Sequence, residues 1–253
     1  MKIGIAGYGF VGKAQELIIR NHGKHDILLS DPQLNLTDDL NRADGVIIAV
    51  ATPPNDDGSC NVFNVIDVVN SISSNIPVLI KSTMSVEGWD LLVKTFPDHQ
   101  LCFSPEFLRE ASWRADAFVD NLYLGGNTIF WESFFETVLQ NVTINIREPR
   151  ELIAGKAFRN SFLAAKVAFF NQIYDYCQAY GLDYYTVRNT IADDERIGYS
   201  HTEITEQRGF GGHCFPKDSM ATITSAKRRQ LDLSILSEAI EYNNIVRKEQ
   251  CLT

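Results

Sequence analysis

A glycine-rich turn near the start of the chain constrains the fold more than any other feature of the sequence. Residues 7–12 read Gly-Tyr-Gly-Phe-Val-Gly, after the apolar run 2–6 and before a stretch typical of a helix. In such a strand–turn–helix unit the first glycine allows a tight turn, the second lets a pyrophosphate approach the backbone, and the third lets the helix pack on the strand. The helix N-terminus then offers amides to the phosphates. The pattern predicts a dinucleotide site at Gly7, Gly9 and Gly12.

An acidic residue, Asp31, closes the second predicted strand nineteen residues after Gly12. A carboxylate there accepts a hydrogen bond from a ribose 2′-hydroxyl and repels a 2′-phosphate, which favours NAD over NADP. The alternative is a turn and a helix cap with Asp31 merely solvated. Only fourteen residues separate Asp31 from Val46, so we expect a cut-down crossover and a thin wall beside the adenine.

The first half of the chain alternates short apolar runs with amphipathic stretches such as 13–21 and 64–71. The predicted strands are residues 2–6, 27–30, 46–50, 78–81, 101–103 and 142–146. This alternation of predicted strands and helices is typical of an α/β fold with a Rossmann-type doubly wound parallel sheet. We therefore expect an NAD-binding domain over residues 1–149.

The second half, residues 150–253, has the character of an all-helical domain. Residues 151–180 contain no proline and one glycine, and they predict one long central helix that stops at Gly181. Its apolar residues do not keep to one stripe, so it must be covered on several sides, between domains or in a dimer interface. Further helices are predicted at residues 184–192, 217–228 and 234–248.

Charge and cysteine usage limit the partners and the compartment. With 23 basic and 32 acidic residues the net charge is −9, which argues against a nucleic-acid or anionic membrane surface. No apolar run approaches the ~20 residues of a membrane span, and the start Met1-Lys2-Ile3 is typical of a strand, not of a signal peptide. Five cysteines without a CxxC pair disfavour zinc and disulfides and fit a reducing cytoplasm.

The stretch 209–218, Gly-Phe-Gly-Gly-His-Cys-Phe-Pro-Lys-Asp, is the most informative in the chain. Pro216 suits the first turn of a helix, which puts Cys214 just ahead of a helix N-terminus. The helix dipole and the cation of Lys217 both favour a thiolate there. A lone cysteine is usually a small buried hydrophobic residue, and we expect that of Cys60, Cys102, Cys177 and Cys251. For Cys214 we predict a nucleophile, and for His213 a plain loop position.

Two further groups of polar residues stand out. Lys156 and Asn160 are four residues apart on the long helix and share a face among phenylalanines, where they need partners unless that face is solvated. The stretch 104–110 follows a strand end, where open α/β sheets place ligands. Glu106 and Glu110 in it are either functional or surface acids at the first turn of a helix.

Together these motifs resemble the UDP-glucose/GDP-mannose dehydrogenase family, NAD-dependent enzymes that oxidise a nucleotide-sugar alcohol to a uronic acid. The resemblance covers nearly the whole chain. The motifs are GYGFVG at 7–12, ATPPN at 51–55, KST at 81–83, FSPEFLRE at 103–110, Lys156 with Asn160 and FFNQ on the long helix, DDERIG at 193–198 and GFGGHCFPKD at 209–218.

The resemblance implies roles for individual residues. Cys214 would form a thioester, Lys156 would stabilise oxyanion charge and assist proton movement, and Asn160 would hold the sugar. Asp218 with Thr83 would bind or activate water, and Glu106 would serve thioester hydrolysis. Cofactor contacts are implied for Gly7, Gly9, Phe10, Val11, Gly12, Asp31, Thr52, Pro53, Thr83, Glu110 and Lys217. Substrate contacts are implied for Phe107, Leu108, Lys156, Asn160, Arg196, Phe210 and Gly211.

The family pattern also implies a dimer around the long helix, with Arg196 reaching the sugar from the other subunit. It favours a UDP-sugar over a GDP-sugar and continues into a second doubly wound domain, beginning where this sequence reaches Thr253. Two other hypotheses stay open. One is a single-step NAD-dependent β-hydroxyacid or alcohol dehydrogenase, and the other is a non-catalytic NAD-binding dimerisation subunit that needs a partner chain.

Overall fold

The computed structural model describes residues 1–212 and 214–250, apart from the side chains of Glu110 and residues 248–250. His213 and Cys251, for which the sequence predicts a loop position and a buried thiol, lie outside the described residues. The chain separates into two compact units. The N-terminal unit comprises residues 1–55 and 60–156, and the C-terminal unit comprises residues 56–59 and those that follow 156.

Within the described residues, eight strands form one sheet in the order β3-β2-β1-β4-β5-β6-β7-β8. The strands are β1 (Lys2–Ala6), β2 (Asp26–Asp31), β3 (Leu36–Thr37), β4 (Gly45–Ile48), β5 (Val78–Ile80), β6 (Leu101–Phe103), β7 (Asn121–Gly126) and β8 (Thr143–Ile146). All neighbouring pairs are parallel except β2–β3 and β6–β7. The predicted α/β fold with a Rossmann-type sheet is confirmed, and the two antiparallel pairs correct the expectation of a wholly parallel one.

The connection between Asp31 and β4 contains only short elements. It holds no α-helix but the 3-10 turns η1 (Pro32–Leu34) and η2 (Leu40–Arg42), with β3 between them. Oδ2 of Asp38 accepts a hydrogen bond from the backbone of Leu29, 2.8 Å away, and fastens this connection to β2. The fourteen residues of the crossover therefore connect β2 to β4 without an α-helix.

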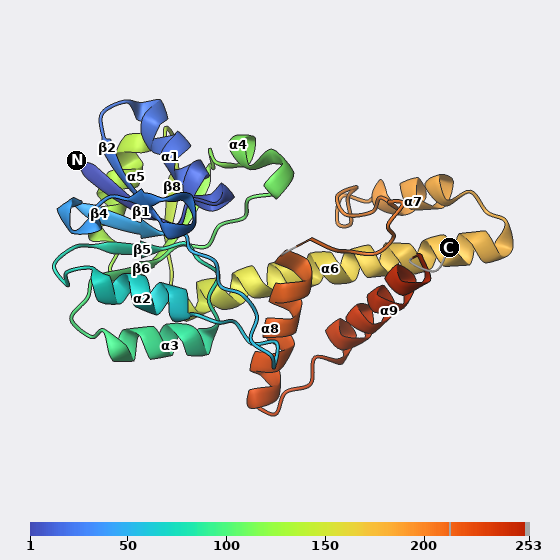
Figure 1. Ribbon diagram of the computed structural model, residues 1–253. Helices are drawn as coiled ribbons and strands as arrows, with labels where there is room; N and C mark the ends of the chain where they lie inside the picture. The colour runs from blue at the N-terminus through green and yellow to red at the C-terminus, as the bar shows by residue number, and fades with distance from the viewer. Residues whose placement is uncertain (213, 251–253) are drawn as a thin grey trace. The chain divides into compact units, whose positions relative to one another are not determined.

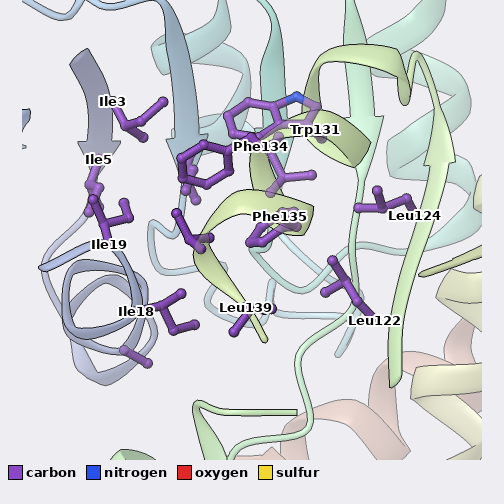
Figure 2. Close-up of a cluster of buried hydrophobic side chains, with 14 of the residues drawn as sticks. Ile3, Ile5, Ile18, Ile19, Leu122, Leu124, Trp131, Phe134, Phe135 and Leu139 are labelled. Atoms are coloured by element: carbon purple, nitrogen blue, oxygen red, sulfur yellow. The ribbon is translucent and has the colours of Figure 1, made fainter. Parts of the chain in front are cut away.

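A cluster of buried aromatic and branched residues packs one face of the sheet (Figure 2). β1 contributes Ile3 and Ile5, and α1 (Phe10–His22) lays Ile18 and Ile19 against them. The helix α5 (Ile129–Val138) adds Trp131, Phe134 and Phe135, all at most 1 % exposed. The helices α2 (Phe63–Ser71) and α3 (Val86–Thr95) cover the other face (Figure 1). Helices on both faces explain why the central strands β5 and β6 are apolar throughout and fully buried.

Several elements of the N-terminal unit were not predicted. They are β7, the helices α3, α4 (Trp113–Asp116) and α5, and the 3-10 turn η3 (Glu110–Ser112). In β7 only Leu122 and Leu124 are strongly apolar, and the flanking glycines and asparagine disfavour a strand. Pairing with β6 and β8 outweighs that local preference.

The C-terminal unit is helical. Its elements are α6 (Pro149–Tyr180), whose first turns belong to the N-terminal unit, α7 (Tyr184–Ala192), α8 (Cys214–Arg228) and α9 (Ser234–Gln250). The long helix starts two residues before the predicted Glu151, because Pro149 is well suited to a first helical turn. It ends before Gly181, whose φ of 65° permits the turn.

The two sides of α6 in the C-terminal unit differ. Phe170 and Cys177 are buried in a cluster with Tyr184 of α7, and Ala164 and Ala168 pack in another cluster. The other side bears exposed aromatic rings. They are Phe158, Phe162, Phe169, Tyr176 and Tyr180, between 52 % and 68 % exposed. At about 100° per residue all five lie within roughly 40° around the helix, which makes one continuous aromatic stripe. Of the described helices, none is long and apolar enough to cross a membrane.

Candidate active site

The glycine loop lies between β1 and α1, and its three glycines meet different surroundings. Gly7 has a φ of 84°, and a Cβ there would lie 2.6 Å from the carbonyl oxygen of Ala49. A Cβ on Gly12 would lie 2.1 Å from the carbonyl oxygen of Gly7. A Cβ on Gly9 would meet nothing within 4 Å. Folding therefore requires glycine at Gly7 and Gly12, whereas at Gly9 it leaves open space over the backbone.

The start of α1 is suited to an anion. Gly9 is its N-cap and supplies no side-chain acceptor for the first amides of the helix. Phe10 and Val11, the first two helical residues, are half-buried. Open space beside the N-terminus of a thirteen-residue helix is the geometry that a pyrophosphate requires.

Asp31 connects the glycine loop to the end of β2. Its Oδ2 accepts a hydrogen bond from the backbone N–H of Tyr8 at 2.7 Å, and its Oδ1 accepts one from Gln33 at 3.1 Å. Each carboxylate oxygen keeps a second lone pair, so Asp31 can still accept a bond from a ribose hydroxyl. The loop and this carboxylate fit a dinucleotide with a free 2′-hydroxyl.

A buried polar cluster lies at the carboxyl edge of the sheet, where β5 and β6 end. Nζ of Lys156 donates hydrogen bonds to Oε1 of Glu106 at 2.6 Å and to Oγ1 of Thr83 at 3.1 Å. The Lys156 side chain is 4 % exposed and that of Glu106 12 %. Oε2 of Glu106 accepts a bond from the backbone N–H of Leu108 at 3.0 Å, which fixes the carboxylate. All four residues belong to the N-terminal unit.

The Glu106 carboxylate is ion-paired with Lys156 and mostly buried, so it is not a solvated surface acid. Glu106 also precedes the 3-10 turn at 110–112 and is not in the first turn of a helix. The side chain of Glu110, the other candidate acid, lies outside the described residues. The Phe107 ring packs edge-on against Tyr123, and Leu108 packs against the core cluster of Figure 2.

The loop that follows β4 carries two of the expected cofactor contacts. Thr52 is 6 % exposed, and Pro53 is exposed. The carbonyl oxygen of Pro53 accepts a bond from the backbone of Asn61 at 2.9 Å, and that of Ala51 accepts one from the side chain of Asn64 at 2.8 Å. The loop is thus fastened to the start of α2.

A second polar cluster lies within the C-terminal unit. Nδ2 of Asn160 donates a hydrogen bond to Oδ2 of Asp218 at 2.7 Å. Nζ of Lys217 lies 2.8 Å from Oδ1 of the same carboxylate. Asp218 is 4 % exposed, so an ionised carboxylate there needs these partners. Asn160 and Asp218 therefore act as one bonded pair.

Cys214 is the first residue of α8, which starts three residues before the predicted helix at 217–228. The prediction placed it ahead of the helix because Pro216 was taken as the start, but proline fits anywhere in the first turn. Cys214 remains at the N-terminus, where amide dipoles favour a thiolate. It is half-buried, whereas Cys60, Cys102 and Cys177 are buried.

Two buried asparagines, Asn171 of the FFNQ motif and Asn243, hold the loop upstream of Cys214. Nδ2 and Oδ1 of Asn243 bond the carbonyl and the amide of Phe210, at 3.1 and 2.6 Å. Oδ1 of Asn171 accepts a bond from the amide of Gly209 at 3.0 Å. The Phe210 ring is 4 % exposed in the core of its unit, and a Cβ on Gly211 would lie 3.0 Å from the Arg247 guanidinium. No role was predicted from the sequence for either residue, and Asn243 lies outside every motif, because these contacts join distant helices.

Arg196 is exposed and pairs with its near neighbour Asp194, at 2.5 Å between NH2 and Oδ2. Nζ of Lys166 on α6 donates to the carbonyl oxygens of Ile197 and Gly198, at 2.6 and 3.1 Å, and holds this segment. The arginine is thus free of the core and projects from an anchored turn.

A Rossmann sheet with this glycine loop and with Asp31 at its carboxyl edge is the architecture of an NAD-binding domain. The chain belongs to the UDP-glucose/GDP-mannose dehydrogenase family. The sequence model of the family's NAD binding domain matches residues 30–143, and that of its central domain matches residues 151–245. The resemblance in the motifs is confirmed, and NAD is the cofactor of the matched N-terminal domain.

Relatives by sequence include the UDP-glucose 6-dehydrogenase of Campylobacter jejuni, which is 27 % identical over 98 % of this chain and 73 % of its own. The UDP-glucose 6-dehydrogenase YwqF of Bacillus subtilis is 31 % identical over 81 % of this chain and 49 % of its own. The chain thus spans about half the length of the Bacillus relative. A UDP-glucose dehydrogenase structure from Pyrobaculum islandicum superposes with a TM-score of 0.80 at 24 % identity, over 96 % of this chain and 68 % of its own, and supports the fold.

Proposed function

We propose that this chain carries out the NAD-dependent oxidation of the 6-hydroxymethyl group of a nucleotide sugar to a carboxylate, in two hydride transfers through a Cys214 thioester. The observation that carries the proposal is the pairing of the polar residues. Lys156 is bonded to Glu106 and Thr83, and Asn160 is bonded to Asp218. Polar side chains at such low exposure cost stability unless they are partnered, and these are partnered with one another.

The roles of these residues follow from their chemistry. NAD, when bound, supplies the acceptor for the hydride in each oxidation. Lys156 donates a hydrogen bond and positive charge to the oxygen that becomes negative when a carbonyl is attacked. Cys214 adds its thiolate to the carbonyl carbon of the aldehyde, which forms the C–S bond later found in the thioester. Asn160 holds the sugar and the same oxygen.

Release of the carboxylate requires water. Glu106 accepts a proton from the water that attacks the thioester carbon, and the C–S bond breaks to return the Cys214 thiolate. Asp218 and Thr83 bind and orient water in this proposal. The backbone N–H of Leu108 and the Lys156 ammonium hold the two oxygens of Glu106, so the carboxylate keeps one orientation.

The cofactor and substrate contacts are proposed from the same family pattern. The loop residues Gly7–Gly12, Asp31, Thr52 and Pro53 would hold NAD with Thr83, Glu110 and Lys217. Phe107, Leu108, Arg196, Phe210 and Gly211 would contact the substrate together with Lys156 and Asn160. We favour a UDP-sugar over a GDP-sugar, since the relatives by sequence carry UDP-glucose in their names.

We further propose a homodimer through α6. The support is the stripe of exposed aromatic rings, which includes Phe162 and Phe169. Contiguous exposed apolar surface of this kind marks interaction sites in soluble proteins.

The test is the number of NADH molecules formed per sugar, with UDP-glucose, UDP-N-acetyl sugars and GDP-mannose as substrates. Two NADH per sugar and loss of turnover in Cys214→Ser support the proposal. One NADH per turnover with little loss in Cys214→Ser selects a single-step dehydrogenase. No NADH from any sugar, beside a clear thermal shift with NAD, selects a binding subunit whose activity appears only with a partner chain.

A further inference from the structure

A second lysine is buried beside the Glu106–Lys156 pair, and the proposed reaction does not use it. Lys81 directly follows β5 at the carboxyl edge of the sheet and is 4 % exposed. Its Nζ donates a hydrogen bond to Oγ of Ser104 at 3.1 Å and lies 6.0 Å from the centre of the Phe135 ring. Among the residues that the structure describes, the Ser104 hydroxyl is its one hydrogen-bond acceptor.

Two ammonium groups, those of Lys81 and Lys156, lie near the Glu106 carboxylate at this edge. Glu106 contacts Lys156 at 2.6 Å and attracts the charge of Lys81 from further away, whereas Lys156 repels it. Cys102 of β6 also faces Lys81. A cavity of about 40 Å³, with room for one or two water molecules, is lined by both Lys81 and Glu106.

The remaining acid on the cavity wall is already neutralised. Asp116 of α4 receives two hydrogen bonds from the guanidinium of Arg109, at 2.6 and 2.9 Å. It does not compensate Lys81. Of the two acids on this wall, Glu106 is therefore the one not bonded to Arg109, and it is ion-paired with Lys156.

A charge placed in this way does not stabilise the fold. Burial lowers the pKa of Lys81 to about 8, with Glu106 opposing that shift and Lys156 adding to it. A methionine of similar length would avoid the cost of desolvating an ammonium group. The contribution of Lys81 is therefore the electrostatic effect of its charge on Glu106 and Lys156.

We propose that Lys81 is a positioning residue for the Glu106–Lys156 pair. Its buried positive charge, beside that ion pair, makes the Lys156 ammonium a readier proton donor. Two like charges placed near each other disfavour each other's charged form, so the proton of Lys156 leaves more easily while Lys81 is charged. The inference rests on the proposed function, in which Lys156 assists proton movement.

The direct test is the titration of Lys156 followed by NMR in protein labelled with ¹³C at the lysine ε-carbons. The Lys156 signal is assigned by its loss in Lys156→Arg. In Lys81→Met the midpoint of this titration is expected to rise by about one pH unit, and Lys81→Arg is expected to restore it. An unchanged midpoint in Lys81→Met overturns the proposal.

Two further variants make the test specific. Lys166→Met removes a lysine of the C-terminal unit that donates hydrogen bonds to the backbone carbonyls of Ile197 and Gly198, and it should leave the Lys156 midpoint in place. An equal rise in Lys166→Met contradicts a local effect. If Lys81→Met does not fold, Lys81→Gln keeps a donor for Ser104 without the charge and is expected to give the same rise.

The NMR test needs neither substrate nor NAD. It therefore tests the role of Lys81 even if the chain forms no NADH. Absence of NADH in the wild type counts against the proposed function alone. Where NADH forms, the limb of the pH–rate profile that follows Lys156 is expected to move upward in Lys81→Met and to return in Lys81→Arg. A rate that falls without any movement of the profile counts against the positioning role.

Discussion

Lys156 and Glu106 form an ion pair of 2.6 Å, although fifty residues separate them in the sequence. The first turns of α6 bring the lysine to the carboxyl edge of the sheet, and the backbone of Leu108 fixes the other oxygen of the carboxylate. The two groups of this pair have opposite charges, are mostly buried and are held in a fixed geometry.

Replacement of Glu106 by glutamine keeps the shape of the side chain and leaves the buried Lys156 without its counter-ion. We expect NADH formation from a UDP-sugar to fall by about a hundredfold or more, because a proton acceptor is lost. The thermal shift caused by NAD should remain. The exposed Glu136→Gln on α5 is the matched control and should retain the wild-type rate. A rate for Glu106→Gln within threefold of the wild type would contradict the role.

The two glycines at the start of the cofactor loop should respond in opposite ways to alanine. A Cβ at Gly9 meets no atom within 4 Å, so Gly9→Ala should keep the melting temperature of the free protein and lose the NAD-induced shift. Gly7→Ala should lower the melting temperature itself, because the residue has a φ of 84° and its Cβ would lie 2.6 Å from a carbonyl oxygen. Calorimetry with and without NAD separates the two effects. A normal NAD shift in Gly9→Ala would show that the pyrophosphate does not lie over this residue.

Cys214 should be the first of the described cysteines to react with iodoacetamide at pH 8. It is half-buried at a helix N-terminus, whereas burial raises the pKa of the Cys102 thiol to about 12. Peptide mass spectrometry of a labelling time course gives the rate for each site, and Cys102 serves as the internal control. Labelling of Cys102 as fast as Cys214 would be incompatible with this structure.

The stability of the fold should depend on Lys81 at alkaline pH. Since burial lowers its pKa in the folded state to about 8, from a usual value near 10.5, the unfolded chain binds more protons between these values. Stability attributable to this residue therefore rises as pH increases through that window, by up to about 3 kcal/mol. Denaturation of wild type and Lys81→Met at pH 7.5 and pH 10 gives the difference directly. A difference that stays constant with pH argues against a buried charge.

The aromatic stripe on α6 predicts the oligomeric state. Phe162→Glu places a charge in the middle of the stripe and should convert a dimer to a monomer, as measured by analytical ultracentrifugation. Phe63→Glu on α2 changes an equally exposed phenylalanine outside the stripe, 64 % against 68 %, and should leave the dimer intact. A wild-type monomer at micromolar concentration would disprove dimerisation through this face.

The sequence predicted those features that depend on residues close together along the chain. The glycine loop, the ends of most strands, the long helix and its stop at Gly181 follow from local periodicity and from the conformational freedom of glycine. The family followed from short motifs that keep their order. Local rules failed for β7, where only alternate residues are apolar, and for the start of α8, where Pro216 fits more than one position of a first turn.

Tertiary structure alone decided which polar groups meet. The bonds of Lys156 to Glu106 and of Asn243 to Phe210 join residues fifty and thirty-three positions apart, and no periodicity encodes such contacts. The burial of Lys81 could likewise not be predicted from the sequence, since a lysine after a strand is usually solvated. The sequence by itself thus determined the class of fold, the family and the chemical types in the site. Packing determined their pairing and charge balance, because desolvation and Coulomb interaction depend on separation in space and not along the chain.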